Sequence, residues 1–178
     1  MISATLDTSV YIRALHFGGP ATIIIGHARA GSIRIDISDA IVAETNRVLR
    51  DKFQWDGYSL QDAREKLRAL GNHVSPTETL HVIKEDPDDD RILECAATAK
   101  SGFIVSEDKD LLRLGQFGNT RIVPVREFIS LALTPGTRGK CRVTKVGWCR
   151  RSAGCHPMSA NLRRSWFRIA DKPGASWS

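Results

Sequence analysis

The stretch DPDDDRILECAATAKSGFIVSEDKDLLRL, residues 86–114, decides the fold. Apolar residues at Ile92, Leu93 and Ala96 predict a helix that begins within residues 86–90 and runs to Lys100. The apolar run 103–106, which follows a glycine, predicts a strand. A helix that leads directly into a buried strand is typical of a parallel sheet wrapped by helices.

The rest of the first 134 residues alternates in the same way between apolar runs and helical patterns. Ser38 suits the N-cap of a helix to Lys52, and Ser59 with Asp62 suits the start of another to Leu70. The pattern predicts an α/β fold, a three-layer α/β/α sandwich with a central parallel sheet. Further helices are predicted at 9–15, 20–30 and 126–133, and further strands at 4–6, 33–35, 80–83 and 122–125.

Charge divides the chain near Thr134. Residues 1–134 hold 16 Lys and Arg against 19 Asp and Glu, whereas residues 135–178 hold 10 against 1. The second part is rich in Gly, Ser and Pro and has no sustained period. We therefore predict a domain over 1–134 and a basic, largely disordered tail over 135–178. No apolar run approaches the roughly 20 residues that span a bilayer, and no secretory signal opens the chain, so we expect a cytoplasmic protein.

Four acids occupy positions that suggest a site. Asp7 and Asp108 directly follow predicted strands, and ligands of open parallel sheets bind at the carboxyl ends of the strands. Glu44 and Asp89 lie on helical positions that should face the core, where a carboxylate is costly unless it is paired or metal-bound. Each acid alone also suits an ordinary role, such as a helix cap. The other aspartates at the start of the same helix, Asp86, Asp88 and Asp90, are expected to be solvated first-turn residues.

Convergence of four carboxylates has an electrostatic consequence. Each pair at about 4 Å would repel by roughly 4 kcal/mol at an effective dielectric near 20, so a positive charge must lie among them. Hard divalent cations prefer oxygen ligands, and Mg²⁺ keeps several waters while it binds few carboxylates. An acidic pocket of this kind therefore predicts Mg²⁺ or Mn²⁺.

Several segments resemble the motifs of PIN domains, with a likeness that covers residues 2–133. LDTSVYIRAL (6–15) resembles the opening motif, VAETNRVL (42–49) the central helix, RIVPVREFISL (121–131) the terminus, and residues 86–114 the third and fourth motifs. The resemblance implies catalytic, metal-binding acids at Asp7, Glu44, Asp89 and Asp108, with the third ligand left open among Asp88, Asp89 and Asp90. It implies supporting roles for Ser9, Ser106 and Asp110.

The resemblance also implies a function. PIN domains of this kind are divalent-metal-dependent endoribonucleases that hydrolyse RNA phosphodiester bonds, and this sequence is most similar to VapC-like toxins of type II toxin–antitoxin systems. The implied partners are an RNA substrate, a cognate antitoxin protein and a second copy in a homodimer. Two alternatives stay open: a catalytically weak PIN module that binds RNA or protein, and a Mg²⁺-dependent phosphoacceptor or phosphatase domain. The last needs a second Asp two residues after the first, where this chain has Ser9, or a Lys near a late strand.

The tail has two interpretations. Its basic residues, interleaved with Trp148, Trp166 and Phe167, suit the phosphates and bases of single-stranded RNA. Alternatively it is an extension without a selected role, which we favour because it shows no helix or strand periodicity. The candidate RNA contacts are Lys140, Arg142, Arg150 and Arg151.

Overall fold

The computed structural model describes residues 1–83 and 87–133 of the 178, without the side chains of Pro87, Asp88 and Leu133. The tail 135–178 and its candidate RNA contacts, Lys140, Arg142, Arg150 and Arg151, lie outside the described residues. The division of the chain into a domain and a tail therefore stays a prediction.

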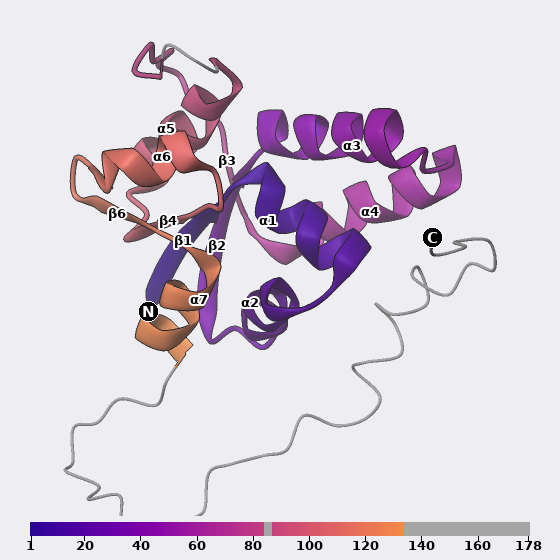
Figure 1. The fold of residues 1–178 in the computed structure, drawn as a ribbon, viewed down its shortest axis with the longest axis horizontal. Helices are drawn as coiled ribbons and strands as arrows, with labels where there is room; N and C mark the ends of the chain where they lie inside the picture. The colour runs from indigo at the N-terminus through magenta and orange to yellow at the C-terminus, as the bar shows by residue number, and fades with distance from the viewer. Residues whose placement is uncertain (84–86, 134–178) are drawn as a thin grey trace, which may run out of the picture. The chain divides into compact units, whose positions relative to one another are not determined.

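A six-stranded sheet forms the centre of the fold (Figure 1). The strand order is β3-β2-β1-β4-β6-β5, and neighbours are parallel except for the antiparallel pair β5 and β6. Ala4 pairs with Ile35 on one side and with Phe103 on the other, which fixes the register at the centre of the sheet. The strands are β1 Ile2–Leu6, β2 Ile33–Ser38, β3 Asn72–Val74, β4 Phe103–Val105, β5 Gln116–Phe117 and β6 Thr120–Val123.

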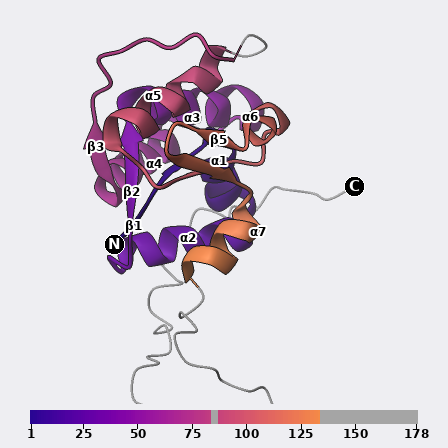
Figure 2. The same ribbon diagram turned by 90° about the vertical axis from the view of Figure 1, so that its left-hand side faces the viewer.

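Helices flank this sheet (Figures 1 and 2). Helix α5 packs against β1, β2 and β4, whereas α2 packs against β2 and contacts α4, α7 and η2. The predicted α/β fold class with a central parallel sheet is confirmed. The helices are α1 Thr8–Ile12, α2 Pro20–Arg29, α3 Asp39–Phe53, α4 Gly57–Leu70, α5 Pro87–Ala99, α6 Lys109–Leu114 and α7 Val125–Phe128, with π-helical turns η1 Arg13–Phe17 and η2 Ile129–Leu133.

Strand β2 shows why the sheet must be covered on both faces. Ile33, Ile35 and Ile37 are buried on one face, while Asp36 on the other face is fully buried as well. The Asp36 carboxylate accepts hydrogen bonds from Arg34, Asn72 and Ser101 at 2.7 to 3.1 Å. A buried charge is tolerated when it is paired and hydrogen-bonded in this way.

The predicted strand at 80–83 is wrong. Its backbone N–H groups donate to carboxylates of α5: Leu80 to Glu94 at 2.9 Å, and Val82 and Ile83 to Asp90 at 3.1 and 3.0 Å. Because these donors are already satisfied by side chains, the segment has no need of a neighbouring strand. The edge of the sheet is formed instead by β3, directly after α4.

Asp90 corrects a second expectation. It is only 3% exposed, not solvated, because its carboxylate accepts hydrogen bonds from those two backbone N–H groups.

The predicted helix start at Ser59 is also wrong. Helix α4 begins at Gly57, and the N-cap is Asp56, which accepts from the Ser59 N–H at 2.8 Å. The predicted N-cap Ser38 is present, accepting from the Ile41 N–H at 3.4 Å.

Candidate active site

A cleft of about 370 Å³ lies beyond the carboxyl ends of β1 and β4. Asp7 enters it from the end of β1 and Asp108 from the turn after β4, while Glu44 comes from α3 and Asp89 from the first turn of α5. Four acids that are up to 101 positions apart in the chain thus line one cleft. The remaining lining residues are Thr8, Ser9, Ile12, Arg47, Val48, Asp51, Lys52 and Ile92.

Asp7 is the most buried of the four acids, with 5% exposure. It occupies the N-cap position of α1 but makes no capping hydrogen bond with its side chain. Instead its Oδ2 accepts from the hydroxyls of Ser9 at 2.5 Å and Ser106 at 2.6 Å. Burial raises the pKa of Asp7, the hydrogen bonds from Ser106 and Ser9 lower it in part, and the charge of Asp108 raises it further. The two hydrogen bonds therefore fix the orientation of the Asp7 carboxylate. Its negative charge is unfavourable there unless a positive charge lies near it.

Asp108 is more exposed and caps α6. Its Oδ1 accepts from the Asp110 N–H at 2.7 Å, and its own N–H donates to Ser106 Oγ at 2.9 Å. Ser106 therefore contacts both aspartates, since its hydroxyl donates to Asp7. The Asp110 side chain pairs with Arg113 at 2.9 Å. Asp110 therefore contributes to the site through its backbone N–H, which holds the Asp108 carboxylate in place.

Glu44 is held by an ion pair on its own helix. Its carboxylate accepts two hydrogen bonds from Arg47, at 2.7 and 2.8 Å, and its side chain is 25% exposed. The sequence indicated that a carboxylate here must be paired or metal-bound, and in this structure it is paired. Arg47 itself was missed, although its position three residues after Glu44 is a recognisable helical pairing distance. Asp51 and Lys52, one turn further along α3, also line the cleft and were missed.

The structure distinguishes Asp89 from Asp90 as candidates for the third ligand. Asp89 lines the cleft, whereas the carboxylate of Asp90 is turned to the backbone of the 80–83 segment. The side chain of Asp88 lies outside the described residues. Asp90 is therefore engaged elsewhere, and Asp89 is the described member of the three that faces the other acids.

The donor set suits a hard divalent cation in kind, since the four predicted acids and Asp51 line one cleft and Asp108 acts electrostatically on Asp7. The present arrangement is not closed around an ion. Among the residues that the structure describes, no three His, Cys, Asp or Glu side chains are grouped closely enough to hold a metal. Glu44 is turned to Arg47 and Asp108 to the α6 backbone, so binding would require these side chains to rotate.

None of the helices in residues 1–83 and 87–133 is long and apolar enough to cross a membrane.

The PIN domain family model matches residues 3–110, which is more than half of the chain. Among solved structures, a chain of the crystal structure of VapBC2 from Rickettsia felis, bound to a DNA fragment from their promoter, aligns with a TM-score of 0.52 and 13% identity. The alignment covers 69% of this chain and 98% of that chain, and at this identity it shows a shared fold. Comparison with curated proteins gave no match. The extent of the family match, on a fold of this topology, establishes that the chain belongs to the PIN domain family.

Proposed function

We propose that this PIN domain is a divalent-metal-dependent endoribonuclease. The observation that carries the proposal is the convergence of Asp7, Glu44, Asp89 and Asp108 on one cleft at the carboxyl ends of β1 and β4. A bound Mg²⁺ or Mn²⁺ would supply an activated water and stabilise charge on the phosphodiester. The four carboxylates are the groups of this chain that would hold it.

The chain's own residues have separable roles in this proposal. Asp7 is the fixed anchor because Ser9 and Ser106 hold it in one orientation. Glu44 is the adaptable ligand, because its carboxylate would turn from Arg47 to a cation. Arg47 lines the same cleft and carries donors suited to two phosphate oxygens. Arg47 thereby neutralises Glu44 in the free protein and positions the RNA backbone in the complex.

We further propose that the chain acts as the toxin of a type II toxin–antitoxin pair, with an antitoxin protein as partner and a homodimer as its assembly. Support comes from the fold likeness to VapBC2 and from the resemblance of the sequence motifs. Induced expression should arrest growth of a bacterial host, and Asp7→Asn should abolish the arrest. Growth arrest by both forms would refute a nuclease toxin.

A second candidate is a PIN module that binds RNA or protein without cutting it. The Glu44–Arg47 ion pair favours this candidate, since it leaves the carboxylates without a closed metal site. The two candidates differ in what a metal does to the protein and to RNA.

The experiment that separates them compares thermal melting of the wild type and of Asp108→Asn, with EDTA and with Mn²⁺, and then assays both for RNA cleavage. A ligand at a hundredfold excess over its dissociation constant stabilises the folded state by about 2.7 kcal/mol, so a real site is measurable. Asp62→Asn is the matched control, because it removes the same charge from an ion pair with Lys66 on α4. Mn²⁺ should stabilise and activate the wild type and the control alone. Stabilisation without cleavage would favour the binding module, and neither effect would refute the metal site.

A further inference from the structure

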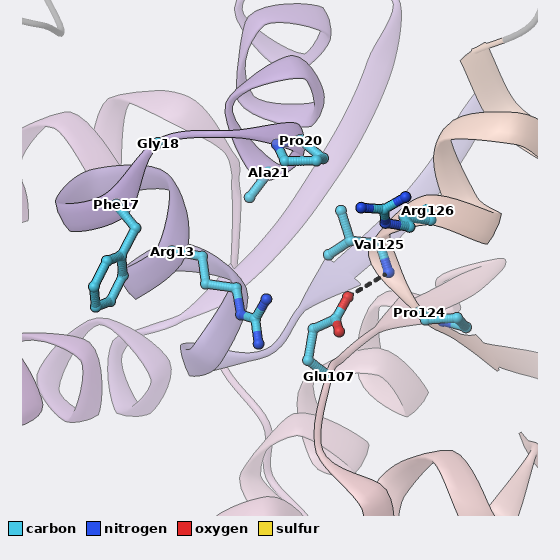
Figure 3. Close-up of a pocket in the computed structure, with 9 residues that line it drawn as sticks. All are labelled: Arg13, Phe17, Gly18, Pro20, Ala21, Glu107, Pro124, Val125 and Arg126. Carbon is cyan, nitrogen blue, oxygen red and sulfur yellow. Dashed lines mark hydrogen bonds between the residues drawn. The ribbon is translucent and has the colours of Figure 1, made fainter.

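A second hollow of about 510 Å³ lies beside the acidic cleft. It is bordered by η1, the start of α2, and the segment that leads into α7 (Figure 3). Two chain segments connect it with the cleft. Ile12 lines the cleft and Arg13 the hollow, and Asp108 lines the cleft and Glu107 the hollow. A chain molecule bound in one site therefore has a short path to the other.

Two arginines give this hollow its charge. Figure 3 shows the guanidinium groups of Arg13 and Arg126 extending into the same space from opposite sides. Within the part of the chain that the structure describes, neither side chain has an ion-pair or hydrogen-bond partner. Most other described arginines are paired with a carboxylate, among them Arg34, Arg47, Arg50, Arg68, Arg91, Arg113 and Arg121.

Among the described residues that line the hollow, Glu107 is the one acid, so the two guanidinium groups give this lining a net positive charge. The Glu107 carboxylate accepts a hydrogen bond from the Val125 N–H at 3.1 Å, which joins the turn after β4 to the start of α7. The Glu107 carboxylate is therefore already hydrogen-bonded to the protein backbone. Neither arginine lies within ion-pair distance of it.

The rest of the lining is apolar. Phe17, Pro20, Ala21, Pro124 and Val125 form the walls, and Phe17 is 64% exposed. The volume falls within the range of roughly 300 to 1,000 Å³ that is usual for small-ligand sites. An occupant must therefore combine an anionic group for the arginines with an apolar or aromatic body for the walls. The chain's own tail does not suit this charge, because residues 135–178 hold 10 Lys and Arg against 1 Asp and Glu.

We propose that this hollow is a nucleotide subsite for single-stranded RNA. Arg13 and Arg126 bind a backbone phosphate next to the one that is cut, and the base lies against the apolar wall with Phe17. Arginine forks suit phosphate oxygens, and aromatic side chains stack on any base. This inference rests on the proposed ribonuclease function, since RNA is the ligand that would run from the hollow into the carboxylate cleft.

The test uses the full chain, a short fluorescein-labelled single-stranded RNA and Mn²⁺. The double variant Arg13→Ala/Arg126→Ala should raise KM about tenfold or more while kcat changes little, because the two arginines position the RNA away from the reacting atoms. The dependence of log affinity on log salt should become shallower by about 0.7 for each phosphate that the protein no longer neutralises. Arg68→Ala/Arg121→Ala is the matched control, since it also removes two positive charges and neither residue lines the hollow or the cleft.

Phe17→Ala tests the base contact separately. It should weaken RNA binding about 5- to 100-fold, and Phe17→Trp should restore it, since a stacked base contributes roughly 1 to 3 kcal/mol. Thermal melting of each variant shows whether the fold is kept, because the partly exposed Phe17 ring also contacts His16 and Phe53, with ring centroids 4.7 and 5.6 Å apart. Equally weak binding by Phe17→Ala and Phe17→Trp would contradict the stacking role.

Fluorescence anisotropy in EDTA separates failure of the subsite from failure of the nuclease. If the wild type cuts RNA and the double variant matches the control in KM and salt dependence, the subsite is refuted and the nuclease stands. If nothing is cut but RNA binding is abolished only in the double variant, the subsite stands and the nuclease is refuted. If a polyglutamate peptide binds the wild type, fails to bind the double variant and RNA binding is unchanged, the hollow is an acidic-peptide site and the proposal is overturned.

Discussion

At the scale of single residues, the cleft contains a buried carboxylate, Asp7, whose charged form is disfavoured by burial. Asp7 is almost fully buried, and burial outweighs the two serine hydroxyls in raising its pKa. A residue that lowers stability in the free protein and is nevertheless oriented by two hydrogen bonds is typical of a functional site. The cost of Asp7 can be measured directly.

We expect Asp7→Asn to melt higher than the wild type in EDTA at neutral pH, by about 2 to 8 °C for roughly 1 kcal/mol. The amide keeps an acceptor for a serine hydroxyl and removes the buried charge. Differential scanning fluorimetry checks this, with Asp62→Asn as the control at a part-buried ion pair outside the cleft. A lower melting temperature for Asp7→Asn in EDTA would show that the carboxylate stabilises the free protein.

Cys95 gives a second prediction at this scale. Cys95 is fully buried, and burial raises the pKa of its thiol to about 11. At pH 8 the reactive thiolate should therefore be roughly one molecule in a thousand, even before access is considered. Peptide mass spectrometry should show no iodoacetamide on Cys95 in the native protein and full labelling in urea. Native labelling at a rate typical of an exposed thiol would contradict the burial.

At the scale of elements, hydrogen bonds to two carboxylates of α5 take the place of strand pairing in the segment 80–83. Asp90 and Glu94 receive three backbone N–H groups of the segment that precedes α5, and they fix this segment as a loop against the helix. The same turn of α5 presents Asp89 to the cleft. Asp90 therefore acts as an anchor that sets the orientation of the first turn of α5.

We expect Asp90→Ala to lower the free energy of unfolding by about 2 to 3 kcal/mol, because the part-buried N–H of Val82 and the buried N–H of Ile83 lose a charged acceptor. Asp90→Asn should cost less, since its carbonyl oxygen still accepts. Urea denaturation measures both, and Asp62→Ala provides a control at a part-buried ion pair that should change the free energy of unfolding by about 1 kcal/mol. Equal effects of Asp90→Ala and Asp62→Ala would mean that the loop is held by other contacts.

At the scale of the whole molecule, the sheet joins segments that are distant in sequence. Asp36 on β2 binds Asn72 on β3 and Ser101 just before β4, and Ser101 in turn contacts Thr5 on β1. These contacts tie four strands of the sheet together within the first 133 residues. The site and its supports lie within the same residues.

The predicted division into a domain over 1–134 and a tail over 135–178 can be tested by truncation. We expect a chain ending at residue 134 to fold, with a far-ultraviolet circular dichroism spectrum and melting temperature close to those of the full chain. Metal-dependent cleavage should also be retained, since the four acids lie within residues 1–134. Loss of cleavage with retained folding would assign a role in RNA binding to the tail and refute our preferred interpretation of it.

The sequence by itself determined the fold class and the N-cap of α3 at Ser38, because hydrophobic period and cap chemistry are local properties. From motif spacing it predicted the four acids as one candidate site. It did not reveal the loop at 80–83, the buried role of Asp90, or the ion pair between Glu44 and Arg47 at the cleft. It also did not reveal the hollow between Arg13 and Arg126, whose positions are 113 residues apart. Only the tertiary structure decides these features, since a side chain's partner depends on which distant segment the fold brings within hydrogen-bond distance.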